Sequence, residues 1–400
     1  MLEENRVYRT LLDQHSPHWR LQDAERKVLA EKQTTWQVFE RGQQHRASRT
    51  VQQLESCGHD DRDCSGRDTH LPDHFNSCQT TESSSPNRRV GHNTCSVNLL
   101  GIEIGGSKLQ LVTGDETGRI RQRCRLVVDP VRGAEGIRRQ IEQKLPALLQ
   151  PGRIEAAGVG FGGPVDWSRG TICRSHQLAG WSGFDLVQWL QPQTNAPVFV
   201  DNDGNVAALG EATRGAGVGL NPVFYVTLGS GVGGGLVING NIYHGAAPGE
   251  SEIGHVRLDR VGTTVESRCS GWSVDARIRD LKITEPSGVL ARLAAGETRG
   301  EAQHLTSALQ QADATARRIV REVGEDLAFG LSHVAHLFHP EIIILGGGLA
   351  GVGEPLRASV ECALRDLTMD AFLPVPKIRL AALGEDAVPV GALLLAEMNR

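Results

Sequence analysis

Residues 199–211 read FVDNDGNVAALGE, a pattern of a strand and then a helix with small or polar residues between them. Residues 198–200 are apolar and predict the strand, and residues 206–209 are apolar and predict the helix. Residues 201–205 would also suit an ordinary turn and helix cap. In α/β sheets, ligands bind at the carboxyl ends of strands, where a carboxylate can accept a proton from a hydroxyl group. We therefore predict that Asp203 is a general base and that the amide beside it holds the hydroxyl group.

The composition of the chain indicates an α/β enzyme with two or three domains. Apolar residues make up 39% of the 400 residues and glycines number 47, which argues against a disordered or fibrous protein. The net charge of −5 argues against a general affinity for nucleic acid. Because no apolar run reaches about 18 residues and no signal-peptide core is present, we expect a cytoplasmic protein without membrane contacts. None of the eight cysteines forms a CxxC pair, which argues against a zinc ribbon.

The first 95 residues differ in composition from the rest of the chain. They are rich in histidine, glutamine, serine and arginine, and residues 80–89 read as a linker. We expect a poorly ordered extension over residues 1–95. A helix-turn-helix over residues 18–43 is an alternative, although the expected turn glycine is missing. Metal binding is another alternative, but the spacing fits no common zinc module at Cys57, His59, Cys64, His70, His74 and Cys78.

Two later segments share the pattern of strand, glycine-rich turn and strand. Residues 97–104 and 109–112 flank the first turn, and residues 223–228 and 236–239 flank the second. Because glycine has no Cβ atom, the backbone of such a turn can come close to a phosphate group. The two similar hairpins suggest two related halves that face each other across one cleft. Glu103, just before the first turn, could act through water on Mg²⁺, which keeps several waters and uses few carboxylates.

A third glycine-rich turn follows an apolar strand near the C-terminus. Residues 341–345 read EIIIL and predict the strand, and a glycine triplet occupies positions 346–348. Glycines at a strand end that opens a helix let a nucleotide base or ribose approach the backbone. Helical spacing of apolar residues predicts helices over 305–338 and over 352–367.

A group of acidic and polar side chains could hold a polyhydroxylated ligand. Glu250, Glu252 and His255 are close in the sequence, and Glu266 follows them. Carboxylates and an imidazole supply the fixed acceptors and donors that such a ligand needs, although ordinary surface charge is the alternative. Gln177, in an extended segment farther back in the chain, could also hydrogen-bond a polar ligand.

Six segments carry a family resemblance by their sequence and their order: IEIGGSK at 102–108, GGPVD at 162–166, VDNDGNVAALGE at 200–211, TLGSGVGGG at 227–235, GESEIGH at 249–255 and ILGGG at 344–348. On these segments, residues 97–400 resemble the ROK family of sugar kinases and related repressors. The resemblance implies an α/β protein with the actin-like, ribonuclease-H-like fold, in which two lobes enclose a cleft, and it implies phosphorylation of a hexose with ATP and Mg²⁺. We expect a small α/β lobe from residues 96–204 and 386–400, a large α/β lobe from residues 205–385, and a homodimer.

The resemblance also assigns roles to residues of this chain. It implies that Asp203 is the base, and the sugar ligands that we predict are Asn202, Glu252, His255, Glu266, Gly163 and Gln177. The three glycine turns would form the ATP cradle, with contacts from Gly105, Gly106, Ser107, Lys108, Thr227, Gly229, Ser230, Gly231, Gly346, Gly347 and Gly348.

Two features depart from the family pattern. The usual aspartate of the first turn is Glu103 here, one methylene longer, which could shift the water that links it to Mg²⁺. The family's CxCGxxGC zinc motif is missing, because the segment that follows His255 contains only Cys269 where the motif requires three cysteines. We therefore predict no structural zinc and expect His255 to serve the sugar alone.

The expected activity is ATP-dependent phosphorylation of a hexose, with glucose at its 6-hydroxyl group as the first choice. One alternative is a sugar-responsive transcriptional regulator without kinase activity. Others are a kinase for N-acetylated amino sugars and a kinase that uses polyphosphate as donor. Sugar choice depends on loop shape, which the sequence does not reveal.

Overall fold

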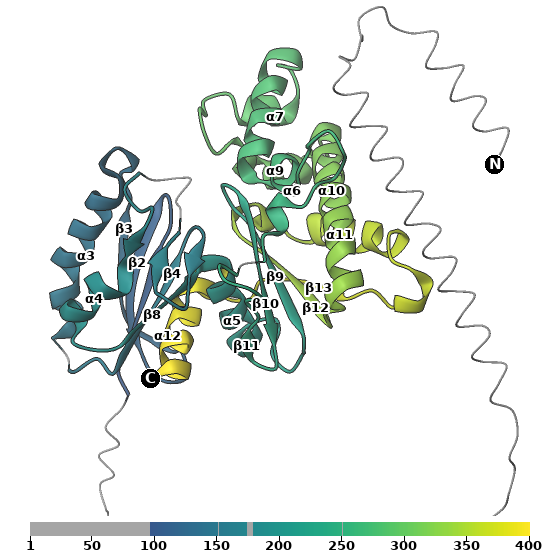
Figure 1. The fold of residues 1–400 in the computed structure, drawn as a ribbon. Helices are drawn as coiled ribbons and strands as arrows, with labels where there is room; N and C mark the ends of the chain where they lie inside the picture. The colour runs from purple at the N-terminus through teal and green to yellow at the C-terminus, as the bar shows by residue number, and fades with distance from the viewer. Residues whose placement is uncertain (1–96, 151, 174–178, 250) are drawn as a thin grey trace, which may run out of the picture. The chain divides into compact units, whose positions relative to one another are not determined.

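A computed structural model describes residues 97–150, 152–173, 179–249 and 251–400 (Figure 1). The extension predicted for residues 1–95 lies outside the described residues, and so do Gln177 and Glu250. None of the helices in the described part of the chain combines the length and the apolarity that a bilayer crossing needs.

The first half of the described chain forms a five-stranded sheet in the order β3-β2-β1-β4-β8. The first three strands in the chain are antiparallel neighbours, whereas β1, β4 and β8 are parallel. Every residue of β1 and β4 is buried, as expected for strands covered on both faces. Helices α3 and α4 cover one face and α12 covers the other (Figure 1). The bounds are β1 Leu99–Ile104, β2 Lys108–Gly114, β3 Ile120–Val127, β4 Ala156–Phe161, β8 Val198–Asn202, α3 Gly133–Leu149, α4 Leu186–Thr194 and α12 Ala387–Asn399.

The second half repeats this plan in a sheet with the order β11-β10-β9-β12-β13. Here too an antiparallel hairpin is followed by parallel strands, which agrees with the two related halves expected from the sequence. Helices α10 and α11 lie on one face and α5 on the other (Figure 1). The bounds are β9 Val223–Leu228, β10 Val232–Ile238, β11 Asn241–Ile242, β12 Ile342–Gly346, β13 Lys377–Leu380, α5 Asp203–Arg214, α10 Ala314–Phe338 and α11 Glu354–Asp366.

Shorter elements connect the two sheets and their helices. A small three-stranded sheet follows β4, and a group of short helices precedes α10. The remaining strands and α-helices are β5 Val165–Asp166, β6 Thr171–Ile172, β7 Phe184–Asp185, α6 Val265–Cys269, α7 Gly271–Thr284, α8 Val289–Leu293 and α9 Leu305–Gln310. The 3-10 helices are η1 Pro130–Arg132, η2 Ile253–His255, η3 Glu301–His304, η4 Gly348–Val352, η5 Asp370–Phe372 and η6 Gly384–Asp386.

The single long helix predicted over residues 305–338 was wrong. The chain breaks between α9 and α10, where Ala312 has a φ of +58°. Asp313 then caps α10, because its side chain accepts a hydrogen bond from the backbone N–H of Ala316. A capping aspartate competes with helix continuation, and apolar spacing alone does not reveal it.

Helices α5 and α12 cross at unusually close range. A Cβ atom on Gly391 would lie 1.8 Å from the carbonyl oxygen of Val206, and one on Gly210 would lie 2.4 Å from that of Ala387. Glycine at both positions therefore lets the two backbones touch. Because α12 packs on β1 and β4 while α5 packs on β9 and β10, this crossing links the two sheets.

Candidate active site

At the junction of β8 and α5, Asn202 caps the helix and is also a residue predicted to bind the sugar. Asn202 is the N-cap of α5, and its Oδ1 accepts hydrogen bonds from the backbone N–H groups of Gly204 (2.8 Å) and Asn205 (3.4 Å). Its Nδ2 donates to the carbonyl oxygen of Gly163 at 3.1 Å. The cap therefore holds the Gly162–Gly163 turn beside the first residue of α5, Asp203.

The Asp203 carboxylate faces both this turn and the first glycine turn. A Cβ atom on Gly162 would lie 3.3 Å from Asp203 Oδ2, 3.4 Å from the carbonyl oxygen of Ile104 and 3.6 Å from the Cα atom of Gly105. The start of α5 also touches the second sheet, since a Cβ atom on Gly204 would lie 2.6 Å from the carbonyl oxygen of Gly234. Backbone from both sheets thus approaches the start of α5, the helix whose first residue is Asp203.

The surroundings of Asp203 suit a general base. Burial raises the pKa of Asp203 from its ordinary 3.8 to about 7, and the charges of Glu103 and then Glu252 contribute to that rise. The backbone N–H of Gly204 opposes the rise by favouring the charged form. A carboxylate with a pKa near neutrality is better matched to proton transfer than an ordinary aspartate.

Glu103 lies in a buried polar group at the end of β1. Its Oε1 is 2.9 Å from Lys108 Nζ, and its Oε2 accepts a hydrogen bond of 2.7 Å from Gln110 Nε2. Burial raises the pKa of Glu103, although the Lys108 charge acts in the opposite direction. Gln110 is fully buried on β2 and was missed by sequence reasoning; a polar residue in the apolar run KLQLV was its one signal.

The second glycine turn meets Glu266 and the segment that carries Glu252 and His255. Glu266 Oε2 accepts a hydrogen bond of 2.9 Å from the backbone N–H of Val232, and a Cβ atom on Gly231 would lie 2.4 Å from that oxygen. Glu252 is the N-cap of η2 and His255 is its last residue, and both residues are exposed. A Cβ atom on Gly254, within η2, would lie 2.1 Å from the carbonyl oxygen of Val232. Glu252, His255 and Glu266, three of the six predicted sugar ligands, therefore come from segments that pack on one end of β10.

The third glycine turn packs directly on the second. Gly347 has a φ of +82°, and a Cβ atom there would lie 2.6 Å from the backbone of Leu228. A cavity of about 630 Å³ opens beside both turns. Its lining includes Gly229, Ser230, Gly271, Trp272, Asp275, Gln303, Thr306, Gly348 and Leu349. The first turn is absent from that lining and lies instead by Asp203, so the predicted ATP contacts form two groups.

A buried carboxylate that sequence reasoning missed lies two residues before Asp203. Asp201 Oδ1 accepts hydrogen bonds from the backbone N–H of Asn202 (2.7 Å) and from Asn205 Nδ2 (2.9 Å). Its Oδ2 is 2.6 Å from His244 Nε2. The ring of Trp167 stacks on His244 with centroids 4.2 Å apart and an angle of 18°. Asp201 therefore joins the first turns of α5 to a segment beyond β11.

We predict that His244→Ala lowers catalysis without unfolding the protein. The substitution leaves one oxygen of buried Asp201 unpartnered, and hydrogen bonds to charged groups contribute about 1.5–3 kcal/mol, so we expect kcat to fall about 10-fold. Trp167→Ala is the matched control, because it removes the stacked ring and keeps the pair of His244 with Asp201. Steady-state kinetics and thermal unfolding of both variants provide the check. Asp201 also hydrogen-bonds Asn202 and Asn205, on either side of Asp203, so a shift of Asp201 should misorient Asp203. Equal kcat values for His244→Ala and the wild type would contradict this role in orienting Asp203.

Cys269, the single cysteine left near the place of the family's zinc motif, faces the protein interior. Its side chain is fully buried, and its Sγ lies 3.6 Å from the carbonyl oxygen of Val323. Burial raises the pKa of the Cys269 thiol, so it is a poor source of the thiolate that zinc requires. Within the described residues, no three His, Cys, Asp or Glu side chains are grouped so that they could hold a metal ion.

Comparisons with known proteins agree on the family and the fold. The model of the ROK family matches residues 99–399. The glucokinase of Halalkalibacterium halodurans is 30% identical over 309 residues, which cover 73% of this chain and 92% of that protein. The xylose repressor of Caldicellulosiruptor bescii is 26% identical over 257 residues, or 62% of this chain and 64% of the repressor.

A solved structure extends the comparison to three dimensions. The ROK family glucokinase from Streptomyces griseus, in complex with glucose and AMPPNP, matches with a TM-score of 0.68 and 31% identity. The match covers 76% of this chain and 100% of that one. The actin-like fold expected from the sequence is therefore confirmed. The chain belongs to the ROK family.

Proposed function

We propose that this protein transfers the γ-phosphoryl group of ATP to the 6-hydroxyl group of a hexose, with glucose as the first candidate. The observation that carries the proposal is the Asp203 carboxylate, whose pKa is raised to about 7 and which lies against Gly162 and the first glycine turn. The glucokinases among the relatives support the reaction class. The N-acetylated amino sugars remain alternative acceptors, and polyphosphate remains an alternative donor.

In this mechanism, the hexose hydroxyl group attacks the γ-phosphorus while its proton moves to the Asp203 carboxylate. The bond from phosphorus to the ADP oxygen breaks as the new oxygen–phosphorus bond forms. Such transition states are loose and ask little of a base, so correct positioning contributes most of the acceleration. Asn202 would orient the attacking hydroxyl group, and Glu252, His255 and Glu266 would hold the other hydroxyl groups of the ring.

The residues around the glycine turns fit a nucleotide. The cavity of about 630 Å³ has the size of a small-molecule site, and glycine backbone forms part of its wall. A Cβ atom on Gly348 would meet nothing within 4 Å, so the third turn leaves room for a base or ribose. The phosphates would then extend over Gly229, Ser230 and Gly231 toward the first turn.

The residues also fit Mg²⁺ held partly through water. An ionised carboxylate has about four lone-pair positions, and in Glu103 two are taken by Lys108 and Gln110. The remaining lone-pair positions of Glu103 would accept a hydrogen bond from a water molecule bound to Mg²⁺. When bound, Mg²⁺ supplies neutralisation of the charge on the phosphate oxygens. We propose that the protein uses no structural zinc, which the buried thiol of Cys269 supports.

A coupled assay tests the proposal with glucose, mannose, N-acetylglucosamine and N-acetylmannosamine, each with ATP or polyphosphate as donor. We expect the highest kcat/KM for glucose with ATP. If only the N-acetylated amino sugars are phosphorylated, the reaction class stands and the acceptor is an amino sugar. If only polyphosphate supports turnover, the reaction class stands and the donor is polyphosphate. If sugar binds by calorimetry while no donor supports phosphorylation, the kinase proposal fails. The relationship to a xylose repressor would then favour a sugar-responsive regulator.

Trp272 lines the proposed nucleotide cavity with 61% of its surface exposed. Because stacking of a base on an aromatic ring is worth about 1–3 kcal/mol, we predict that Trp272→Ala raises the KM for ATP about 5- to 20-fold. The KM for the sugar should stay unchanged, and Trp272→Phe should recover most of the ATP affinity. Steady-state kinetics at varied ATP provide the measurement. An unchanged KM for ATP would mean that the base lies elsewhere.

A further inference from the structure

Glu266 lies on a helix that is too short to hold its own position. Helix α6 spans five residues, Val265–Cys269, and isolated helices of that length are unstable in water. Glu266 is in its first turn, and its carboxylate accepts the hydrogen bond from Val232 at the second glycine turn. Contacts made by the rest of α6 must therefore determine where this carboxylate lies.

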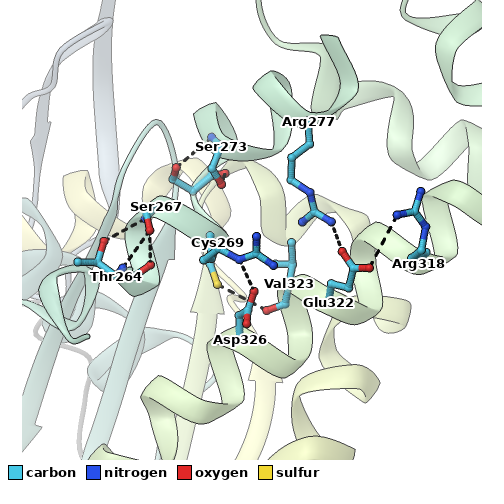
Figure 2. Close-up of polar contacts among 11 residues, drawn as sticks. Thr264, Ser267, Cys269, Ser273, Arg277, Arg318, Glu322, Val323 and Asp326 are labelled. Carbon is cyan, nitrogen blue, oxygen red and sulfur yellow. Dashed lines mark hydrogen bonds and ion pairs between the residues drawn. The ribbon is translucent and has the colours of Figure 1, made fainter. Parts of the chain in front are cut away.

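Those contacts come from one face of the long helix α10 (Figure 2). Arg268 Nε donates to Asp326 Oδ2 at 2.8 Å. Beside this pair, Cys269 Sγ lies 3.6 Å from the carbonyl oxygen of Val323. Val323 and Asp326 are three residues apart on α10, so they lie on the same face.

The third contact, at the other end of α6, is steric. A Cβ atom on Gly330 would lie 2.5 Å from Val265 Cγ2, so α6 approaches α10 more closely there than alanine would allow. Gly330 is four residues beyond Asp326 and continues the same face. The residue numbers of the three contacts increase along α6 while those of their partners decrease along α10, so the two helices run antiparallel.

Both ends of α6 are also held locally. Thr264 and Ser267 form a capping box, in which each side chain accepts a hydrogen bond from the other residue's backbone N–H (Figure 2). Just beyond the helix, the backbone N–H of Gly271 donates to the carbonyl oxygen of Gly229 at 2.7 Å. A shift of α6 would therefore disturb hydrogen bonds on both sides of the second glycine turn, at Gly229 and at Val232.

We propose that the α10 face formed by Val323, Asp326 and Gly330 positions Glu266 and the second glycine turn, with Arg268 and Asp326 as positioning residues. The inference rests on the proposed function in one respect, namely the role of Glu266 as a sugar ligand. Arg268 and Asp326 retain 42% and 29% side-chain exposure, and such pairs contribute little to global stability. Their loss should therefore change substrate affinity more than it changes unfolding.

The neighbouring ion pair provides a matched control. Arg277 on α7 pairs with Glu322 on α10, which also faces Arg318 (Figure 2). This pair joins α7 to α10 as the pair of Arg268 and Asp326 joins α6 to α10. Helix α7 begins at Gly271 and so contacts Gly229, but it does not carry Glu266. Arg277→Ala should therefore leave the KM for the sugar unchanged.

The test compares Arg268→Ala, Arg268→Lys and Arg277→Ala in kinetics, calorimetric sugar binding and thermal unfolding. Because Arg268 acts on the sugar through Glu266, we expect Arg268→Ala to raise the sugar KM about 5-fold, which corresponds to about 1 kcal/mol. Arg268→Lys should give a KM between those of Arg268→Ala and the wild type. In a Glu266→Gln background, Arg268→Ala should add less than about 2-fold, because its effect passes through the lost carboxylate.

A steric pair tests the same face without changing charge. Gly330→Ala should raise the sugar KM, because its methyl group displaces the stiff β-branched side chain of Val265. Adding Val265→Ala should restore affinity by making room. The inference is overturned if Arg268→Ala behaves as Arg277→Ala does, or if its effect adds fully to that of Glu266→Gln. A wild type that binds sugar but phosphorylates none would instead overturn the proposed function. In that case the sugar affinities of the variants, measured by calorimetry, would still test whether the α10 face positions Glu266.

Discussion

Replacing Asp203 with asparagine is expected to lower kcat for hexose phosphorylation by about 10²- to 10⁴-fold, the usual contribution of a general base. Asparagine has nearly the same shape but cannot accept the hydroxyl proton. The fold should survive, because the N-cap of α5 is Asn202 and its hydrogen bonds do not involve the Asp203 side chain. The KM for the sugar should change little, since the other predicted ligands remain.

The pH dependence of the wild type should report the same carboxylate. Because the pKa of Asp203 in the ligand-free protein is raised to about 7, the charged form that acts as base is lost as the pH falls below 7, and kcat/KM should fall with it. The effect on stability has the opposite direction. An acid with a raised pKa binds more protons folded than unfolded, so its contribution to stability declines as the pH rises from 3.8 through about 7.

Asp203→Asn should lack both effects. At pH 8 the variant should unfold at the same temperature as the wild type or a higher one, because it no longer buries a charge. Steady-state kinetics between pH 5 and 9, about two units either side of neutrality, and calorimetric unfolding at both ends measure the two effects. Turnover of the variant near the wild-type rate would remove Asp203 from the mechanism.

Replacing Gly391 with alanine is expected to reduce the free energy of unfolding by about 3 kcal/mol, at the upper end of the range for overpacked sites. The added Cβ atom would lie 1.8 Å from the carbonyl oxygen of Val206, a backbone atom that no rotamer change can move. Helices α5 and α12 would have to separate. Alanine gains about 1 kcal/mol in helix propensity over glycine, which offsets only part of the loss.

Denaturant unfolding followed by far-UV circular dichroism gives the free energy of unfolding for this comparison. Gly296→Ala is the matched control, because a Cβ atom there would meet nothing within 4 Å. We expect the control to stay within about 0.5 kcal/mol of the wild type, as surface substitutions usually do. A Gly391→Ala variant as stable as the control would mean that the backbones of α5 and α12 are farther apart at Gly391 than the structure shows.

Local patterns in the sequence anticipated the features that depend on neighbouring residues. The strand and helix around Asp203, the glycine hairpins and the glycine triplet after β12 all lie within single short segments. Side-chain period, turn chemistry and capping act over a few residues and can be read there. The sequence did not predict the helix break before Asp313, because a capping residue and an apolar helical pattern overlap in the same stretch.

Partners distant in the chain could not be found in this way. His244 reaches Asp201 across 43 positions, and Arg268 meets Asp326 across 58 positions. Gln110 is near Glu103 in the sequence, but their contact depends on the register of the β1–β2 hairpin, which places the two residues opposite each other. The roles of the predicted sugar ligands stay predictions, and Gln177 lies outside the described residues.

The amino-acid order was sufficient to specify two strand–glycine–strand hairpins, a carboxylate at a strand end and a third glycine turn after β12, because each depends on interactions between near neighbours. Only the folded chain determined the raised pKa of Asp203, the close crossing of α5 and α12, and the seating of α6 on α10. Burial, charge proximity and backbone contact are distances in space, and they exist only after segments far apart in sequence have packed together.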